Sequence, residues 1–364
     1  MARDPVYYAD YLKLPTLLSL QSPESGKVGA PMGDEYLFII VHQAYELWFK
    51  QVLIELDAVL DGFSGPAVAE RELGRFVGHL ERVVAITRLM LAQIDVLETM
   101  TALDFLDFRD LLVPASGFQS AQFRSIENKL GLDPRTRMTI HGAHYTSRLS
   151  PEDKARAEAA EAAPSIRARV DAWLARIPFL EQGGWGFRES YRAALDATLT
   201  REAEIIAENP MLDAIGRGVQ EAQLAQNRAH FEALFDADAY EALRDKGERT
   251  LSHRAFLAAL FINLYRDEPI LHLPYRLLKA LMDVDEGFTT WRYRHALMVS
   301  RMIGTRVGTG GTSGHEYLRA TAEKHKVFSD LFALSTYMLP RSKLPRLPAS
   351  VEGALGFRSG VSAG

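Results

Sequence analysis

The chain has 364 residues, of which 47% are hydrophobic and 24% charged, with 26 Gly and 16 Pro. This composition is typical of a globular protein with a sizeable core and excludes collagen-like, mucin-like and largely disordered chains. The sequence contains 0 Cys, which excludes disulfides, cysteine-ligated metals, iron–sulfur clusters and a cysteine nucleophile.

The charge balance argues against nucleic acid as a partner. The formal net charge is −5, from 42 Lys+Arg against 47 Asp+Glu, so no basic footprint for a phosphate backbone is expected. The longest uninterrupted apolar run is Ala255 to Ile262, far shorter than the ~20 residues of a membrane-spanning helix. The first residues contain no continuous apolar region of the signal-peptide kind. We therefore expect a cytoplasmic protein with no membrane partner.

The hydrophobic periodicity predicts an all-α fold, because apolar residues recur at helical spacing and no series of alternating strands is found. The first long helix is expected from Asp34, a good N-cap residue, to about Leu60. A second long helix is expected over about 67–112, where Pro114 stops it, and a shorter one over 119–130, before Gly131.

The second half of the chain also has helical periodicity. An Ala- and charge-rich stretch, about 151–185, is expected to form an exposed helical excursion that ends near Gly183 and Gly184. The further helices are expected over about 190–209, 212–243, 252–267, 274–282, 288–303 and 316–337. We thus predict a single all-α domain over residues 1–340, with an N-terminal arm over about 1–30. Residues 341–364, with several Pro and Gly, are expected to be a mobile tail.

His295 lies on an apolar stripe of the expected helix 288–303. Its neighbours at helical spacing are Phe288, Trp291, Met298, Val299 and Met302. A histidine on such a face is either a core residue bonded to a neighbour or an axial ligand to haem iron, for which a neutral imidazole is suited. One helix does not decide between these two interpretations.

His42 and Phe38 lie one turn apart on the first long helix. A structural role fits the pattern, and so does a pocket with an aromatic face and one polar group for a flat apolar ligand that carries an N–H. Arg109 shares a helix face with Phe105 and Leu112. It either pairs with a structural carboxylate or holds the carboxylate of a substrate through its planar fork.

The segment 304–314 has five Gly in eleven residues. It matches neither a P-loop nor a dinucleotide-binding fingerprint, and composition leaves a hinge and a ligand-covering loop equally open. Thr309 is one of its hydrogen-bonding residues. Two weaker patterns are set aside: the formal G-x-S-x-G match at the chain end lacks its structural context, and His141 with His144 lack a third metal ligand.

Three ordered blocks together carry a family resemblance. They are DEYLFIIVHQAYELWFKQ at 34–51, LETMTALDFLDFRDLLVPASGFQSAQFRSIENKLG at 97–131, and WRYRHALMVSRMIGTRVGTGGTSGHEYLR at 291–319. In these blocks the chain closely resembles the tryptophan 2,3-dioxygenases, and weaker similarity extends over most of the chain from Tyr7 to about Arg341. The resemblance implies a helical homotetramer with one haem b, and so one iron, per subunit. The implied reaction inserts O2 into the indole C2–C3 bond of L-tryptophan to give N-formylkynurenine, the first step of tryptophan breakdown by the kynurenine route.

The resemblance also implies roles for individual residues. His295 corresponds to the axial iron ligand, His42 to the distal histidine that meets the indole N–H, and Arg109 to the arginine that holds the substrate carboxylate. The remaining site residues it implies are Phe38, Phe105 and Leu112 around the indole, Thr309 at the amino-acid end, Ser116 near the haem edge, and Tyr8 and Tyr11 from a neighbouring subunit. Phe105 is a mild departure, because some members have tyrosine there.

Two alternatives remain beside this interpretation. A related histidine-ligated haem oxygenase that acts on another indole or aromatic amino acid would share much of the pattern. A non-catalytic haem-binding sensor would need His295 but not the substrate residues His42, Arg109 and Thr309.

Overall fold

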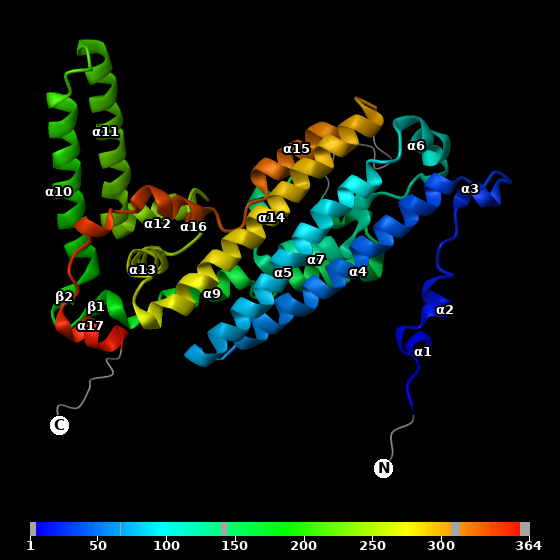
Figure 1. Cartoon of the computed structure of the whole chain (residues 1–364), viewed down its shortest axis with the longest axis horizontal. Coiled ribbons are helices and arrows are strands. Elements are labelled where there is room, and N and C mark those ends of the chain that lie inside the picture. Colours follow the sequence, from blue (N-terminus) through cyan, green and yellow to red (C-terminus); the bar gives the residue numbers. More distant parts are fainter. Residues whose placement is uncertain (1–4, 66, 140–143, 307–313, 357–364) are drawn as a thin grey trace. The chain divides into compact units, whose positions relative to one another are not determined.

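A computed structural model describes residues 5–65, 67–139, 144–306 and 314–356 (Figure 1). The described chain is almost entirely helical, which confirms the all-α prediction, and its strands are a single short hairpin. None of the described helices combines the length and the apolar character that a membrane crossing requires. The described residues group into two compact units: one takes residues from 1–55, 83–163 and 286–325, and the other from 56–82, 164–285 and 326–364.

The first unit begins with an arm of three short helices, α1 (Tyr8–Leu12), α2 (Leu14–Leu17) and α3 (Glu24–Lys27). No side chain of α1 or α2 is buried. The end of the arm is fixed by Glu35, whose carboxylate accepts the backbone N–H groups of Glu24 at 2.7 Å and Ser25 at 2.9 Å.

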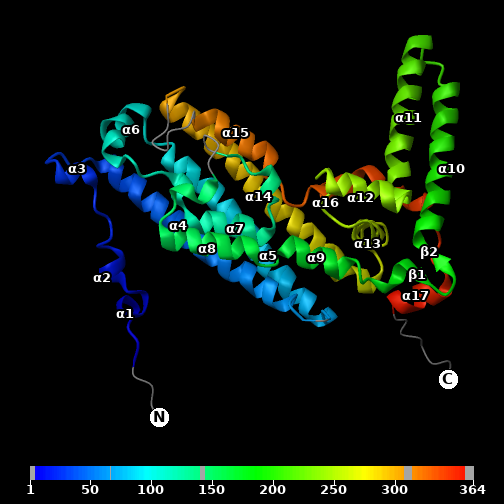
Figure 2. The same ribbon diagram turned by 180° about the vertical axis from the view of Figure 1, so that it is seen from behind.

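The body of the first unit is a set of helices, and its long helices run side by side in both views, with the short α6 at one end (Figures 1 and 2). The helices that contribute to it are α4 (Gly33–Gly62), α5 (Glu70–Leu97), α6 (Ala102–Arg109), α7 (Ala121–Leu130), α8 (Pro151–Ala162), α14 (His272–Ile303) and α15 (Gly314–Lys324). Side-chain hydrogen bonds join neighbouring helices: Tyr45 of α4 donates to the Met90 carbonyl of α5 at 2.7 Å, and Gln122 of α7 donates to the Glu46 carboxylate of α4 at 2.8 Å. These bonds fix the helix faces that surround the pocket described below.

The second unit has its core around α13 (His253–Leu264), most of whose side chains are buried. Its other helices and strands are α9 (Ile166–Leu174), β1 (Glu181–Gln182), β2 (Trp185–Gly186), α10 (Phe187–Glu208), α11 (Ala214–Phe235), α12 (Ala237–Asp245), α16 (Ser329–Ala333) and α17 (Ala349–Leu355). The strands pair antiparallel through a turn at Gly183 and Gly184, whose φ values of 61° and 81° favour glycine. Helices α10 and α11 lie side by side (Figure 1).

Short 3₁₀ turns connect the helices of both units. They are η1 (Asp110–Leu112), η2 (Gly117–Gln119), η3 (Pro134–Thr136), η4 (Tyr145–Arg148), η5 (Pro178–Leu180), η6 (Pro269–Leu271), η7 (Leu334–Tyr337) and η8 (Arg341–Lys343).

Several helix boundaries differ from those the sequence predicts, and capping explains two of them. The helix expected over 67–112 is interrupted after Leu97, because Thr101 starts α6 with a capping box in which its side chain and that of Asp104 bond each other's backbone N–H. The helix expected over 212–243 is divided at Asp236, whose carboxylate accepts two N–H groups at the start of α12.

Two further differences concern the last third of the chain. The helix expected over 316–337 is interrupted between α15 and α16, where the buried Asp285 carboxylate accepts the N–H groups of Val327 and Phe328 at 3.0 and 2.9 Å. The two helices expected over 274–282 and 288–303 are instead the single helix α14.

The segments expected to be exposed or mobile also bury side chains. Helix α9, in the stretch expected to be an exposed excursion, buries Val170 and Trp173. Helix α17, in the region expected to be a mobile tail, buries Val351 and Leu355 completely. In both segments a few apolar residues are enough to attach an otherwise polar helix.

Gly287 explains how α14 continues through a residue that usually weakens helices. A Cβ atom built on Gly287 would lie 2.7 Å from Oγ1 of Thr87 and 3.1 Å from its Cβ, so α14 and α5 approach each other closely here. The Thr87 side chain is fixed in turn, because its hydroxyl donates to the Val84 carbonyl at 2.8 Å. The close packing of the two helices therefore leaves no room for a side chain at this position.

We predict that Gly287→Ala lowers the free energy of unfolding by about 1–2 kcal/mol. Overpacking a close contact costs roughly 1–3 kcal/mol, which exceeds the helix-propensity gain of up to about 1 kcal/mol. Urea denaturation followed by circular dichroism measures the change. The matched control is Gly78→Ala on α5, where the added Cβ meets nothing within 4 Å, so this variant should be as stable as the original or slightly more stable. A stabilised Gly287→Ala variant would contradict the packing argument.

Candidate functional site

A pocket lies within the first unit, lined by residues of α4, α5, α6, α7, α14 and α15. Much of its wall is apolar or aromatic, including Phe38, Leu97, Met298 and Ile303. Polar side chains line it as well, among them three histidines and three arginines. Such a combination of apolar walls and a few polar groups is typical of a small-molecule site.

His295 of α14 lines this pocket with its ring stacked on Trp291, at a centroid distance of 5.2 Å and an interplanar angle of 5°. Burial, and then the proximity of His42, lower the pKa of His295 to about 4. At neutral pH the imidazole is therefore uncharged. A neutral imidazole on an apolar wall has the lone pair that a metal ion binds.

His42 of α4 lines the same pocket, and its hydrogen bond fixes its tautomer. Its Nδ1 lies 2.7 Å from the carbonyl oxygen of Phe38, one turn earlier in the helix. Because a carbonyl oxygen only accepts, Nδ1 of the neutral ring carries the proton and Nε2 is the acceptor. Burial lowers the pKa of His42 despite the opposing effects of this hydrogen bond and of Glu46. The pocket thus contains an uncharged acceptor nitrogen.

The aromatic part of the wall is built around Phe38. Its ring lies 4.0 Å from that of His42 and 5.7 Å from that of Phe105, with which it is stacked at 28°. Phe108 meets it edge-on at 5.8 Å and is fully buried. These rings give His42 and Phe38 a rigid apolar support.

Two further predicted residues lie on the pocket wall. Arg109 is the last residue of α6 and half-buried. Ser116 precedes the 3₁₀ turn η2 and caps it, since its Oγ accepts the N–H of Phe118 at 3.4 Å. The structure therefore brings Phe38, His42, Phe105, Arg109, Ser116 and His295 together in one pocket.

The other predicted site residues are not part of this wall. Leu112, in η1, is not among the described residues that line the pocket. Tyr8 and Tyr11 lie on α1 and are 75% and 74% exposed. Thr309 lies outside the described residues.

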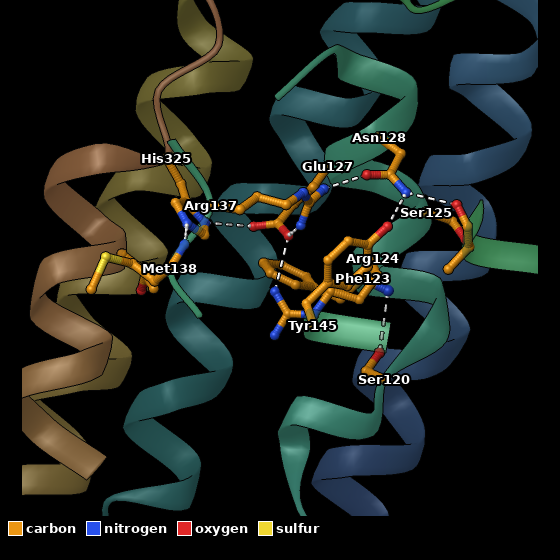
Figure 3. Close-up of polar contacts among 12 residues, drawn as sticks. Ser120, Phe123, Arg124, Ser125, Glu127, Asn128, Arg137, Met138, Tyr145 and His325 are labelled. Carbon is orange, nitrogen blue, oxygen red and sulfur yellow. Dashed lines mark hydrogen bonds and ion pairs between the residues drawn. The ribbon is translucent and has the colours of Figure 1, made fainter. Parts of the chain in front are cut away.

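A buried ion centre that the sequence does not predict lies at the pocket wall and is formed by Glu127, Arg124, Arg137, Arg292 and His325. Figure 3 labels all of these residues except Arg292. Oε2 of Glu127 lies 3.0 Å from Arg124 and 3.0 Å from Arg137, and its Oε1 lies 2.9 Å from Arg292 and 3.2 Å from Nδ1 of His325. All five side chains are more than nine-tenths buried. All except Arg137 line the pocket.

The charges of this ion centre follow from its contacts. Burial alone would raise the pKa of Glu127, but Arg124, the hydrogen bond from His325, Arg137 and Arg292 together hold it well below its usual range. Burial lowers the pKa of His325. As a neutral ring, His325 donates from Nδ1 to Glu127, and its Nε2 accepts the N–H of Met138 at 3.4 Å. The centre therefore joins one carboxylate to three guanidinium groups.

The one signal in the sequence for this centre is the i,i+3 spacing of Arg124 and Glu127 on α7. The same spacing occurs in exposed pairs such as Arg201 and Glu204, so it does not reveal burial. Arg137 is 10 residues from Glu127 in a separate segment, and the last two partners are far away in the sequence, with Arg292 165 and His325 198 residues from Glu127.

Fold and site together define a class: an all-α protein whose largely apolar pocket is lined by uncharged histidines and by arginines. The comparisons with known proteins make the class specific. The family model described as tryptophan 2,3-dioxygenase matches residues 2–338, so the chain belongs to the tryptophan 2,3-dioxygenase family and is a dioxygenase.

Named relatives support the assignment over nearly the whole length. The chain is 48% identical to the tryptophan 2,3-dioxygenase of Bdellovibrio bacteriovorus over 357 residues, which cover 98% of this chain and 99% of that protein. It is 46% identical to the protein of that name from Dictyostelium discoideum, and the match covers 98% of this chain and 89% of that protein. It is 44% identical to the tryptophan 2,3-dioxygenase of Xenopus laevis, and the match covers 95% of this chain and 85% of that protein.

We predict that Glu127→Gln lowers the free energy of unfolding by roughly 3–5 kcal/mol at pH 7, since removing one partner of a buried ion pair leaves uncompensated charge. The folded-state pKa of Glu127 lies below its ordinary value of 4.5. Its contribution is therefore fully present above that value and is lost as the pH falls through the folded-state pKa. The stability difference between the two proteins should be constant from pH 7 to about 5 and shrink below it.

The matched control is Glu323→Gln, which removes the partner of Arg319 in an exposed pair 3.3 Å apart. This variant should lose less than about 1 kcal/mol. Denaturant titrations at several pH values measure both variants. Equal effects at the two positions would show that the ion centre contributes no more than a surface pair.

Proposed function

We propose that the chain binds haem b in this pocket and inserts both atoms of O2 into the indole C2–C3 bond of L-tryptophan, giving N-formylkynurenine. The observation that carries the proposal is the pair of uncharged histidines, His42 and His295, on the walls of one apolar pocket that Arg109 also lines. Membership of the tryptophan 2,3-dioxygenase family supports the same conclusion.

The residues present fit a haem. His295 is uncharged at neutral pH, and Met298, Val299 and Met302 follow it along the pocket wall as apolar neighbours of a flat macrocycle. His295 is thus the proposed axial ligand of the iron, and Ser116 is proposed to lie at the haem edge. Haem, when bound, supplies the oxygen chemistry, so the protein has to ligate it, exclude water and orient the substrate.

His42 is the proposed orienting residue for the indole ring. Its Nε2 is an acceptor because Nδ1 donates to Phe38, and an indole N–H is a donor only. The stacked rings of Phe38 and Phe105 offer a flat apolar surface of the kind that packs against an indole. The hydrogen bond and the aromatic contact together define one orientation of the ring, with Leu112 proposed as a further apolar neighbour.

Arg109 is the proposed partner of the substrate carboxylate. A guanidinium fork binds a carboxylate through two parallel hydrogen bonds, which sets both position and orientation. The half-buried location of Arg109 on the pocket wall strengthens such a contact relative to one in water. Thr309 is proposed to cover the same polar end of the amino acid.

A homotetramer is the proposed assembly. Ile40, Leu47 and Ile54 repeat every seven residues along α4 and are 51%, 54% and 52% exposed, a stripe that a second copy would bury. Tyr8 and Tyr11, exposed on the arm, are proposed to contact the pocket of a neighbouring subunit. Light scattering of the full chain tests the assembly. The cytoplasmic location stays a prediction from the sequence.

The direct test of the proposed function is anaerobic loading of the full chain with haem, followed by addition of L-tryptophan and O2. Formation of N-formylkynurenine, identified by mass, is the expected result. A haem Soret band with no turnover would instead indicate a haem-binding protein without this activity. A product that carries one added oxygen would indicate a monooxygenase.

We predict that His295→Ala removes the five-coordinate ferrous haem spectrum while the helical content is retained, because the axial ligand is lost and the apolar wall remains. Absorption and circular dichroism spectra measure the two effects. The matched control is His253→Ala in the second unit, where the imidazole Nε2 bonds the Leu234 carbonyl at 2.6 Å, and this variant should keep the haem spectrum. If the ferrous haem spectrum of His295→Ala were unchanged, His295 would not be the axial ligand.

We predict that Arg109→Lys lowers kcat/KM for L-tryptophan about tenfold or more and leaves the haem content unchanged. Lysine keeps the charge but loses the planar fork, and a hydrogen bond to a charged group contributes roughly 1.5–3 kcal/mol. The control, Arg294→Lys on α14, alters a guanidinium paired with Asp95 at 2.7 Å outside the pocket, and turnover should be unaffected. If both variants kept full activity, Arg109 would be a structural ion-pair residue.

A further inference from the structure

The buried ion centre contains more positive charge than its own carboxylate neutralises. Three guanidinium groups, those of Arg124, Arg137 and Arg292, meet the single carboxylate of Glu127, and the pKa of His325 is lowered by burial. Arginine does not lose its proton in proteins. Two positive charges are therefore left over among these five residues, in surroundings where an unpaired charge is costly.

The excess charge is directed toward the pocket. On the far side Arg137, which does not line the pocket, lies 4.2 Å over the ring of Tyr145, whose hydroxyl donates to Glu161 at 2.7 Å. Arg124 and Arg292 line the pocket instead. Among the contacts of the described residues, Arg124 reaches Glu127 through Nη1 alone.

The position of Arg292 relates this charge to the haem site. Arg292 precedes His295 by three residues on α14, so the two side chains share one side of the helix, and both line the pocket. Haem b carries two carboxylates on its rim, in addition to the iron at its centre. A cofactor held through His295 therefore has anionic groups to match the two leftover positive charges.

We propose that Arg124 and Arg292 bind the carboxylate groups of the haem, and that Glu127 is the positioning residue that holds both guanidinium groups at the pocket wall. This inference rests on the proposed haem site. Glu127 contacts Arg124 through Oε2 and Arg292 through Oε1, so one side chain sets the position of both. Arg292 is fixed a second time by donating to the His325 carbonyl at 3.0 Å.

The test compares haem with its dimethyl ester, in which both carboxylates are blocked. The full chain is loaded with either porphyrin, and the rate of porphyrin loss to excess apomyoglobin is measured. Arg292→Gln should speed the loss of haem at least tenfold and change the loss of the ester less than twofold, because the ester has no charge for Arg292 to bind. Equal acceleration of both losses would overturn the proposal.

Arg137→Gln is the matched control, since it also removes a guanidinium 3.0 Å from Glu127 but one that does not line the pocket. In Arg137→Gln, the rate of ester loss divided by the rate of haem loss should equal the same ratio in the unmodified chain. The same ratio in Arg137→Gln and Arg292→Gln would contradict the assignment. If Arg292→Gln does not fold, as judged by circular dichroism, Arg124→Gln provides the same comparison.

Glu127→Gln distinguishes positioning from simple charge. If Glu127 acted only through its charge, removing it would slow the loss of haem, because a negative group near the carboxylates would be gone. A positioning role predicts the opposite: faster haem loss with little change for the ester. Slower haem loss would overturn the positioning role. If the unmodified chain does not shift the Soret band of either porphyrin, it is the proposed haem site that fails.

Discussion

The buried carboxylate of Glu127 is the interaction on which the pocket depends most. It joins α7 to the segment that carries Arg137, to α14 through Arg292, and to the end of α15 through His325. Arg292 and His325 are 165 and 198 residues from Glu127 in the sequence, and its single carboxylate contacts both of them together with Arg124 and Arg137. Because the centre is buried, its ion pairs are strong and costly to break. The ion centre thereby links three of the helices that line the pocket, α7, α14 and α15.

Desolvation within the pocket lowers the pKa of both His42 and His295, so both rings are uncharged at neutral pH. His295 is thereby able to bind a metal ion, whereas His42 has a fixed tautomer set by the Phe38 carbonyl. The two proposed roles therefore belong to different helices of the pocket wall: α14 carries the proposed iron ligand, and α4 carries the group proposed to orient the substrate. Arg109, at the end of α6, completes the proposed arrangement for an amino acid with a flat apolar side chain.

The sequence predicts features that depend on local patterns and misses those that depend on distant contacts. The helix expected over 34–60 is confirmed as α4, because a broad apolar face is a local signal, although Asp34 lies in its first turn and not at its N-cap. The continuity of α14 through Gly287 is not predictable in this way, since it follows from the approach of Thr87. Glu127 is missed for the same reason. The site roles of His42, Arg109 and His295 follow from the family resemblance, because each pattern by itself also fits a structural role.

A crystal structure of the full chain loaded with haem and L-tryptophan tests the proposed site most directly. We expect that His295 ligates the iron, that the indole N–H donates to Nε2 of His42, and that Arg109 binds the tryptophan carboxylate. Iron ligation by another side chain, or tryptophan bound away from His42 and Arg109, would contradict it.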